Sequence, residues 1–426
     1  MPFMLNHLKL TRSALRICLT VLLMLSAALP LCAQEKKPAQ SPFQSGPAYK
    51  SMMEFLNALA LIRTTYVDAD KVTDEKLFKA ALRGLLHELD AYSDYESSET
   101  FKATREETTG EIAGIGVVVT CRNRTLEIME VRKDSPAAKA GLKAGDLILE
   151  IDGKTFDNMS GGVRLLRGEV GDPVRLKVYR SANDTTSEIT VERAVIRLSS
   201  VTGAKIIAPG VGYLRIMQFG TRTASELDQA LAQLDQQGMK QLVIDLRNNP
   251  GGLVIAAGDA CSRFLTPGKR IVSLEGRNAK EKQVIVAKPC KSYPDLPVAV
   301  LINENTASAA EIMTACLQDH KRAVAIGERT FGKGVVQTLI PFGEKEALRI
   351  TTAKYYTPAR RVIQDNGIEP DVAVPLSTAR NFALAAQLNF HPGEIRPKIP
   401  NAVRDIQLER AMEILKAVRL FKDGKQ

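Results

Sequence analysis

Ser308 is the side chain in this sequence best placed to act as a nucleophile. It lies in the segment NENTASAAE, after an apolar run that predicts a buried strand and at the start of a predicted helix. Backbone N–H groups at the start of a helix can stabilise the negative charge that develops during acyl transfer. Ser308 and Glu311 also have the spacing of a helix capping box, which stabilises a helix by about 1 kcal/mol. Position alone therefore leaves Ser308 open to both interpretations.

A base for this serine is not found among the histidines. His87, His320 and His391 lie in no H-E-x-x-H pattern, so a zinc site is not expected, and the sequence has no G-x-S-x-G motif. The remaining candidate is Lys333, in the segment GERTFGKG. If it were not a base, it would be an exposed lysine in a loop.

The segment around Lys333 also resembles a phosphate-binding P-loop. Gly327, Gly332 and Lys333 match that motif, but Gly334 stands where a Ser or Thr would hold magnesium. A P-loop opens a helix, whereas the apolar residues after Gly334 predict a strand. Nucleotide binding is therefore disfavoured.

A lysine acts as a base only when its pKa falls far below the usual value. At a pKa of about 10.4, only about one lysine in 2,500 is neutral at pH 7. Lowering that pKa to about 7 corresponds to roughly 4.6 kcal/mol, which burial against apolar side chains can supply. Phe331, Val335 and Val336 are apolar neighbours of Lys333 in the sequence. Gln337 can accept a hydrogen bond from the amine without adding a negative charge.

The N-terminus has the features of a secretory signal. Basic residues precede a short apolar stretch and a small-residue end, which predicts a signal peptide over residues 1–33 with cleavage after Ala33. Lipidation of Cys32 is disfavoured by the bulky Leu31 before it, and an uncleaved membrane anchor stays open. The polar, Pro-rich residues 34–48 predict a flexible tether.

Composition narrows the class of protein. The chain has 426 residues, of which 45% are hydrophobic and 25% charged, so several globular domains are expected. The net charge is +10, but Lys and Arg form no run of five, which disfavours nucleic-acid binding. Six cysteines without a C-x-x-C pair indicate neither a metal site nor a dense disulfide framework. Buried free thiols are expected, and a single bridge stays open.

Helices are predicted at both ends of the mature chain. Residues 49–110 have apolar side chains at helical spacing, and a second helix is expected to begin near Thr73. Its predicted apolar face contains Leu77, Ala81, Leu82, Leu85 and Leu89. Residues 376–426 are helical again, with a helix expected from Val403 to Phe421. Because two helices bury little by themselves, another domain or a second subunit should cover them.

Two further domains lie between these ends. Residues 111–195 contain short β-rich runs and the motif S-P-A-x-x-A-G-L-x-x-G-D-x-I-L-x-I-D-G, which resembles a PDZ domain rather than a generic small β domain. Such a domain adds a peptide as a strand to its sheet, and a glycine loop holds the terminal carboxylate. That loop would consist of Gly114, Ile115, Gly116 and Val117. Residues 196–375 alternate strands and helices, which predicts an α/β core.

Residues 49–375 as a whole resemble the carboxyl-terminal processing peptidases of family S41. The resemblance rests on the PDZ motif, GYLRI, DLRNNPGG, NENTASAAE, the segment around Lys333 and TAKYYTP, all in the same order. It implies a multidomain α/β protein: a helical N-terminal segment, a PDZ domain, and an α/β serine-protease core with C-terminal helices.

The resemblance also implies roles for individual residues. Ser308 corresponds to the family's nucleophile and Lys333, 25 residues later, to its base. Gln337 would help to orient that base. The N–H of Ala309, with that of Gly251 or Gly252, would form the oxyanion hole.

Other implications concern regulation and partners. Arg167 corresponds to an arginine that couples tail binding to the active site, although it would also suit a surface charge at a helix end. The resemblance implies an endopeptidase of the periplasm or cell envelope that needs no cofactor or metal. Its expected partners are protein substrates with apolar C-terminal tails, a helical-repeat adaptor protein and further copies of the chain. The rival interpretation is a non-catalytic PDZ scaffold.

Two departures from the family pattern stand out. Ala359 and Arg360 stand where the family usually has Ser-Gly, directly after Thr357 and Pro358. This departure leaves substrate preference open. The segment from Leu89 to Ser93 lacks the Pro-His pair that the family often has there. This second departure is expected to affect packing more than chemistry.

Overall fold

The computed structural model of this chain describes residues 47–122, 124–278, 280, 282–388 and 403–423. The predicted signal peptide and most of the predicted tether lie outside these residues. Within the described ranges, no helix is both long enough and apolar enough to cross a membrane. The chain divides into two compact units, residues 1–81 and 82–426.

The described part of the first unit consists of helices. They are α2 (Pro47–Thr65), the short 3-10 helix η1 (Ala69–Lys71) and the first half of α3 (Asp74–His87). The α3 helix begins with two acidic residues, as expected from the sequence. No residue of α2 is buried. Arg63 of α2 pairs with Asp74 of α3 at 2.9 Å, and the two helices border a cavity of about 680 Å³.

The predicted apolar face of α3 is only partly covered in the single chain. Leu85 and Leu89, which belong to that predicted face, are 62% and 67% exposed. The buried residue of this helix is Leu86. Helical spacing locates an apolar stripe, but it does not show how much of the stripe a single chain covers. A further helix, α4 (Ser98–Thr109), begins at Ser97 and ends at Gly110, whose φ of 67° suits glycine.

The small β domain predicted from the sequence follows α4. Its strands and helices are β2 (Glu111–Gly114), β3 (Val117–Arg122), β4 (Thr125–Val131), α5 (Pro136–Lys139), β5 (Leu147–Ile151), α6 (Met159–Leu166), β6 (Pro173–Arg180), β7 (Thr185–Glu192) and β8 (Ala194–Arg197). The main sheet has the order β3-β4-β5-β6-β7, while β2 pairs with β8. The domain has its own core, which includes Leu126, Ile148 and Leu176. It can therefore pack independently of the neighbouring α/β core.

The α/β core is built on a six-stranded sheet of order β18-β15-β14-β11-β10-β9. All neighbouring strands are parallel except β9 and β10. The strands are β9 (Val201–Ala208), β10 (Val211–Ile216), β11 (Gln241–Asp245), β14 (Val298–Ile302), β15 (Ala323–Gly327) and β18 (Val372–Ala373). The predicted α/β architecture of this region is confirmed.

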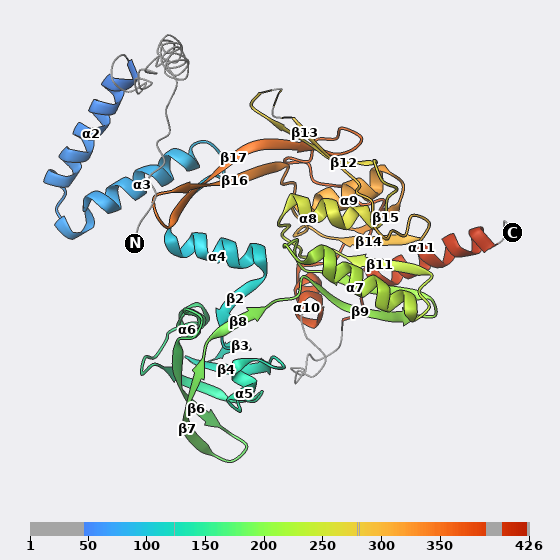
Figure 1. Ribbon diagram of the computed structural model, residues 1–426, viewed down its shortest axis with the longest axis horizontal. Coiled ribbons are helices and arrows are strands. Elements are labelled where there is room, and N and C mark those ends of the chain that lie inside the picture. Colours follow the sequence, from blue (N-terminus) through green and yellow to red (C-terminus); the bar gives the residue numbers. More distant parts are fainter. Residues whose placement is uncertain (1–46, 123, 279, 281, 389–402, 424–426) are drawn as a thin grey trace, which may run out of the picture. The chain divides into compact units, whose positions relative to one another are not determined.

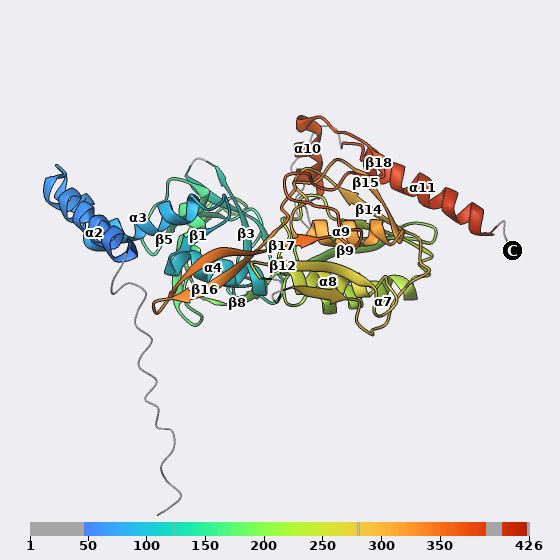
Figure 2. The ribbon, with the colours of Figure 1, turned by 90° about the horizontal axis from the view of Figure 1, so that it is seen from above.

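Helices cover both faces of this sheet. On one face, α7 (Thr223–Gln236), α8 (Val254–Ser262) and α9 (Ala309–Asp319) pack side by side (Figures 1 and 2). On the other face lies α11 (Ile406–Asp423), the helix predicted near the C-terminus. Successive residues of a strand point to opposite faces of the sheet. Ile244 therefore packs on the side of α7, α8 and α9, and Val243 packs on the side of α11. The remaining helix, α10 (Thr378–Leu388), lies between β18 and α11 in the chain.

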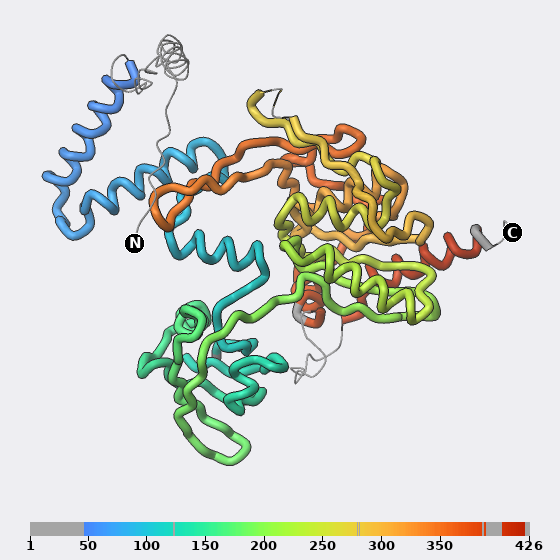
Figure 3. Tube along the Cα trace, in the orientation of Figure 1, coloured from blue at the N-terminus to red at the C-terminus, as the bar shows by residue number. Residues whose placement is uncertain are grey.

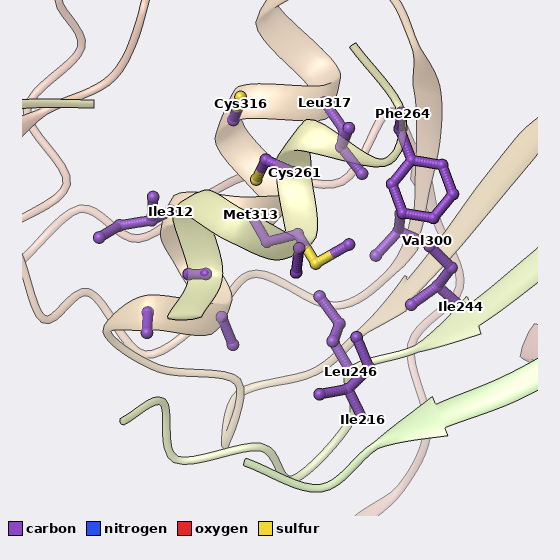
Figure 4. Packing of buried hydrophobic residues seen from close by; sticks show 14 of the residues in the cluster. Ile216, Ile244, Leu246, Cys261, Phe264, Val300, Ile312, Met313, Cys316 and Leu317 are labelled. Carbon is purple, nitrogen blue, oxygen red and sulfur yellow. The ribbon is translucent and has the colours of Figure 1, made fainter. Parts of the chain in front are cut away.

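The core between the sheet and α7–α9 is closely packed (Figure 4). Met313 and Leu317 of α9 lie among Ile216, Ile244 and Val300 of the strands. Cys261 of α8 and Cys316 of α9 are fully buried in the same cluster. These two residues, with Cys121 and Cys290, are free thiols in the described part of the chain. Because α8 and α9 are fixed in this core, the loops that precede them are held close together.

A second, antiparallel sheet joins segments that are far apart in the sequence. It has the order β1-β17-β12-β13, and β16 pairs with β17. Its strands are β1 (Asp94–Glu96), β12 (Arg270–Gly276), β13 (Gln283–Val286), β16 (Val335–Phe342) and β17 (Glu346–Tyr356). Figure 3 shows the long β16–β17 hairpin in orange, beside the blue segment that carries β1. The residues just after α3 are thereby attached to the hairpin that follows Lys333.

Candidate active site

Ser308 occupies a strained turn between β14 and α9. Its φ is 54° and its ψ is −116°, a backbone conformation that non-glycine residues rarely adopt. An ordinary N-cap residue is extended. The Glu311 carboxylate accepts the Ser308 N–H at 2.7 Å, and the Glu311 N–H donates to the Ser308 carbonyl at 2.9 Å. Capping alone does not account for this strain, whereas a sharp strand-to-helix turn is typical of a catalytic serine.

Glu311 connects the serine turn to the loop that carries Lys333. Its side chain is fully buried. Besides the Ser308 N–H, the carboxylate accepts the Thr330 hydroxyl at 2.6 Å and the N–H groups of Gly332 and Lys333 at 2.8 and 2.9 Å. Burial raises the pKa of Glu311, and these hydrogen bonds oppose the rise. The same carboxylate therefore holds the backbones of Ser308 and Lys333.

Tyr355 of β17 makes a second connection between the two segments. Its hydroxyl contacts the carbonyl oxygens of both Ser308 and Lys333, and its distance from the Ser308 oxygen is 3.1 Å. The ring is buried, and burial raises the pKa of the hydroxyl well above its usual value. Tyr355 thus stays protonated and can donate. The structure brings the predicted pair together through their backbones.

The Lys333 side chain is half-buried, and its pKa is lowered. Burial is the main cause, and the positive charge of Arg349 adds to it. The Lys333 ammonium lies 4.9 Å from the centre of the Tyr92 ring. No hydrogen bond between this ammonium and the Ser308 hydroxyl is found among the described residues. The direction of the pKa shift suits a base, but the amine points to Tyr92.

The apolar surroundings of Lys333 differ in part from those suggested by the sequence. Val335 is buried and Val336 is half-buried, but Phe331 is 58% exposed. Tyr92, in the segment from Leu89 to Ser93, is in contact with the ammonium. The expectation that the departure in this segment affects packing more than chemistry stays a prediction. No motif near Lys333 could have indicated Tyr92, because the two residues are 241 positions apart.

Gln337 lies on β16, at a bulge in its pairing with β17. Its amide donates to the Thr351 hydroxyl at 3.3 Å. In the part of the chain that the structure describes, no hydrogen bond joins Gln337 to Lys333. Lys333 lies two residues before β16, the strand that carries Gln337. The orienting role of Gln337 stays a prediction.

Gly251 lies directly against the serine turn. A Cβ added at Gly251 would be 2.7 Å from the Ser308 Cβ and 2.9 Å from the Ala309 nitrogen, and its φ is 105°. The Gly251 N–H donates to the Asn249 side-chain oxygen at 2.8 Å. Within the described ranges, the N–H groups of Ala309 and Gly252 have no hydrogen-bond acceptor. Of the two glycines, Gly251 is thus the one in contact with the serine turn, and Asn249 is a neighbour that sequence reasoning missed.

A buried ionic network fixes the loop that carries Gly251. Arg247 contacts Asp245 at 2.6 Å and Asp405, just before α11, at 2.8 Å. Burial would raise the pKa of Asp245, but the charge of Arg247 outweighs it and lowers the pKa. The Tyr213 hydroxyl donates to Asp245 at 2.8 Å. The C-terminal helix is thus attached to the same loop as the candidate oxyanion hole.

The candidate peptide-binding loop lies at the edge of the small β domain. It runs from Gly114 to Val117, where β3 begins. β3 is the first strand in its sheet order and pairs with β4, so its other edge has no partner strand among the described residues. The Ile115 and Gly116 carbonyls accept the N–H groups of Ala137 and Arg132, both at 2.9 Å. These bonds hold the loop in place beside an open edge.

Arg167 follows the end of α6 and is 44% exposed in its side chain. It lies 3.4 Å from the Glu106 carboxylate of α4. The next residue of α4, Glu107, accepts through its carbonyl a hydrogen bond of 2.9 Å from Gln218 of the α/β core. Arg167 therefore contacts α4, and α4 contacts the core. No residue of the candidate pair touches Arg167 directly.

Among the described residues, no group suited to hold a metal ion is found. The serine turn has N–H donors, the Tyr355 hydroxyl and the Glu311 carboxylate around it, and the segment joined to it carries the Lys333 amine. Such groups can move a proton and stabilise an oxyanion. The arrangement is therefore suited to acyl transfer by a serine nucleophile.

Known proteins resemble this chain in both sequence and fold. A model of peptidase family S41 matches residues 210–374, and a model of the PDZ domain matches residues 127–180. A carboxy-terminal-processing protease of Bartonella bacilliformis is 40% identical over 332 residues, which cover 76% of this chain and 75% of that protein. A CtpA-like serine protease of Staphylococcus epidermidis is 33% identical over 331 residues, which cover 76% of this chain and 66% of that protein.

Solved structures extend the comparison to the fold. An S41 protease from Bacteroides fragilis aligns with a TM-score of 0.50 at 19% identity, over 84% of this chain and 97% of that chain. A photosystem II D1 C-terminal processing protease aligns with a TM-score of 0.43 at 29% identity, over 76% of this chain and 92% of that chain. The alignment with the Bacteroides fragilis protease shows that the two chains share a fold.

Proposed function

The chain belongs to peptidase family S41 and is a serine-type peptidase, and from this premise we propose that Ser308 and Lys333 are its catalytic pair. The observation that carries the proposal is the connection between the two segments. Glu311 holds the N–H groups of both residues, and Tyr355 contacts both carbonyl oxygens. A helix cap beside an unrelated loop lysine would not need this double attachment.

The proposed reaction begins with the neutral Lys333 amine taking the proton of the Ser308 hydroxyl. The oxygen attacks the peptide carbonyl, and the resulting oxyanion accepts hydrogen bonds from Ala309 and a glycine of the loop at residues 251–252. The Lys333 ammonium then gives its proton to the leaving amine, which leaves an acyl-enzyme on Ser308. Water, activated by the same amine, hydrolyses that ester. The lowered pKa of Lys333 supports this cycle because it increases the neutral fraction.

Site-directed variants test the catalytic pair. We expect Ser308→Ala and Lys333→Ala each to lower kcat by about a thousandfold or more, because each removes a group that acts in the chemical step. The substrate is a denatured protein with an apolar C-terminal tail. Lys240→Ala is the matched control, since Lys240 is an exposed lysine of the same domain.

The outcomes separate two classes of protein. The catalytic pair is supported if the wild type cleaves the substrate and both variants do not. Undiminished cleavage by either variant contradicts it. A wild-type protein that binds the tail but never cleaves it is a PDZ scaffold and not a peptidase.

We further propose that the PDZ domain binds the apolar C-terminal tail of the substrate. The open edge of β3 supports this, because a peptide can add there as a further strand. The fixed loop from Gly114 to Val117 is placed to hold the terminal carboxylate. A peptide with an amidated C-terminus should bind much more weakly than the free acid, as measured by fluorescence polarisation. Equal binding would contradict carboxylate recognition.

Arg167 is proposed to couple tail binding to catalysis. Its contact with Glu106, and the contact of the neighbouring Glu107 with Gln218, support this role. Gln218 precedes Phe219, whose N–H donates to the Gly251 carbonyl at 2.7 Å. Arg167→Ala should therefore reduce cleavage of tailed substrates while leaving tail binding itself measurable.

Location and assembly complete the proposal. The carboxy-terminal-processing relative and the signal-like N-terminus support a site of action in the periplasm or cell envelope. The fully unburied helix α2, with exposed apolar residues such as Phe55 and Leu61, supports contact with further copies of the chain or with a helical-repeat adaptor. Light scattering of the purified protein, alone and with residues 47–73 deleted, tests the role of this helix in assembly.

A further inference from the structure

Tyr92 provides an aromatic surface for the Lys333 ammonium. The ammonium nitrogen lies 4.9 Å from the ring centre, within the range of a cation–π interaction. In the described residues, no hydrogen bond or ion pair competes for this ammonium. The ring face attracts a positive charge but has little attraction for a neutral amine. Tyr92 therefore interacts differently with the two protonation states of Lys333.

The loop that presents Tyr92 is held by its own side chains. One oxygen of Asp90 accepts the N–H groups of Tyr92 and Ser93, both at 2.7 Å, and the other accepts the Ser93 hydroxyl at 3.0 Å. Burial would raise the pKa of Asp90, but these hydrogen bonds lower it. The carboxylate thus stays ionised and keeps the loop closed around it.

The same loop is attached to the hairpin beside the active site. The Thr351 N–H donates to the Ser93 hydroxyl, and the Arg349 side chain donates to the Tyr92 carbonyl, both at 3.1 Å. The next residues form β1, which pairs with β17. Arg349 also pairs with Glu96 of β1 at 3.0 Å. The backbone at Tyr92 is therefore held both by Asp90 and by the hairpin.

Charged groups from four elements face the Lys333 amine. Arg349 of β17 acts with burial to lower its pKa. Glu107 of α4, Asp90 of the loop before β1 and Glu311 of α9 act in the opposite direction. The net effect lowers the pKa of Lys333, and a further interaction selective for one protonation state can shift that pKa.

We propose that Tyr92 is a positioning residue for Lys333, which holds the protonated amine away from Ser308 and releases the neutral amine toward it. This inference rests on the proposed catalytic role of Lys333. Loss of the proton weakens the attraction to the ring and at the same time produces the form that can accept a hydrogen bond from Ser308. Before the reaction begins, the ring would therefore keep the charged form of Lys333 away from the base position. It would also keep the amine within the site for the next turnover.

A direct titration of Lys333 tests the inference without relying on catalysis. The protein carries Ser308→Ala and lysine labelled at Cε with an NMR-active carbon isotope. The Lys333 signal is assigned from its loss in Lys333→Met. Tyr92→Leu keeps an apolar side chain but removes the ring, so it should lower the pKa of Lys333 by about half a unit to one unit. Tyr92→Phe keeps the ring and should leave that pKa unchanged.

A kinetic readout accompanies the titration. With Ser308 intact, Tyr92→Leu should move the acid limb of kcat/KM to lower pH by the same amount, while KM stays unchanged. Tyr293→Leu is the matched control, because the Lys291 ammonium lies 5.4 Å from the Tyr293 ring, in a pair separate from the candidate site. The control should leave both the Lys333 signal and the acid limb where they are.

The outcomes are distinct. An unchanged or raised pKa of Lys333 in folded Tyr92→Leu would overturn the inference, and so would an equal shift in Tyr92→Phe, since the hydroxyl would then be responsible. If the predicted pKa shifts occur but Lys333→Ala cleaves as well as wild type, the proposed catalytic pair fails while the contact with Tyr92 stands. If the pair is confirmed and the pKa does not move, only the role of Tyr92 fails.

Discussion

The serine turn and the lysine side chain are held in opposite ways. Around Ser308, the backbone is fixed by the buried Glu311, by Tyr355 and by the close approach of Gly251. The Lys333 backbone shares the contacts with Glu311 and Tyr355, but its side chain extends to the ring of Tyr92 with no hydrogen bond to Ser308 among the described residues. This difference indicates that the positions of the two candidate segments are built into the fold. Under the proposed mechanism, the step that remains is a movement of the Lys333 side chain.

The largest expected effect comes from breaking the shared attachment. Glu311→Ala leaves several buried donors without an acceptor, so we expect a loss of about 3–5 kcal/mol in the free energy of unfolding. Urea denaturation measures this loss, and kcat should fall with it. Glu304→Ala, at an exposed position in the same segment, is the control and should change stability by less than about 0.5 kcal/mol. Equal stability of the two variants would show that Glu311 does not hold the site together.

Gly251→Ala tests how closely the loop approaches the serine. The added Cβ would lie 2.7 Å from the Ser308 Cβ, so one of the two segments must move. We expect kcat to fall by about a hundredfold or more, because a shift of about 1 Å in a catalytic group has an effect of that size. Gly268→Ala is a matched control: its φ of 85° is also positive, but an added Cβ meets no atom within 4 Å. Comparable kcat values for the two variants would contradict the proposed contact.

Tyr355→Phe removes one hydroxyl that touches both segments. The variant should lose about 1–2 kcal/mol of stability and roughly tenfold in kcat, since a buried hydrogen bond is lost and two carbonyl groups are left with fewer donors. Thermal unfolding and steady-state kinetics measure the two quantities. Tyr356→Phe, at the next position of β17, is the control. A large loss in the control with none in Tyr355→Phe would reverse the assignment of the two residues.

The smallest expected effect concerns the charge of Lys333, and here the substitution should stabilise the protein instead of destabilising it. Because burial lowers the pKa of Lys333 in the folded state, the folded protein is less stable when this lysine is protonated. Stability of the wild type should therefore rise with pH between the folded pKa and the usual lysine value. Lys333→Met should raise Tm by a few degrees at low and neutral pH, and this gain should vanish at a pH above the usual lysine pKa. Lys354→Met, on the exposed side of β17, should show no such pH dependence.

Sequence reasoning predicted the order of elements around the candidate pair, but not the contacts that join distant segments. The runs around Ser308 and Lys333 predicted a strand, a helix start and a strand after Gly334, all of which the structure contains. Local patterns suffice there because each element is stabilised by nearby residues and by one apolar face.

The contacts that sequence reasoning missed depend on long-range pairing. β1 is only three residues long, and its register with β17 joins positions more than 250 residues apart. A segment of that length has no periodicity from which pairing could be predicted. The contact between Tyr92 and Lys333 therefore had no signal in the sequence. The strain at Ser308 was likewise invisible, since a backbone φ is not encoded by a single residue type.

Trapping of the acyl-enzyme tests the catalytic pair most directly. Wild type and Lys333→Met would be incubated at several pH values with an activated ester of an apolar peptide, quenched in acid and mapped by mass spectrometry. We predict that the acyl group is found on Ser308 in the wild type, that its formation rate rises with pH through the lowered pKa of Lys333, and that it forms at least about a hundredfold more slowly in Lys333→Met. Acylation of another residue, or equal rates at Ser308 in both proteins, would contradict the account.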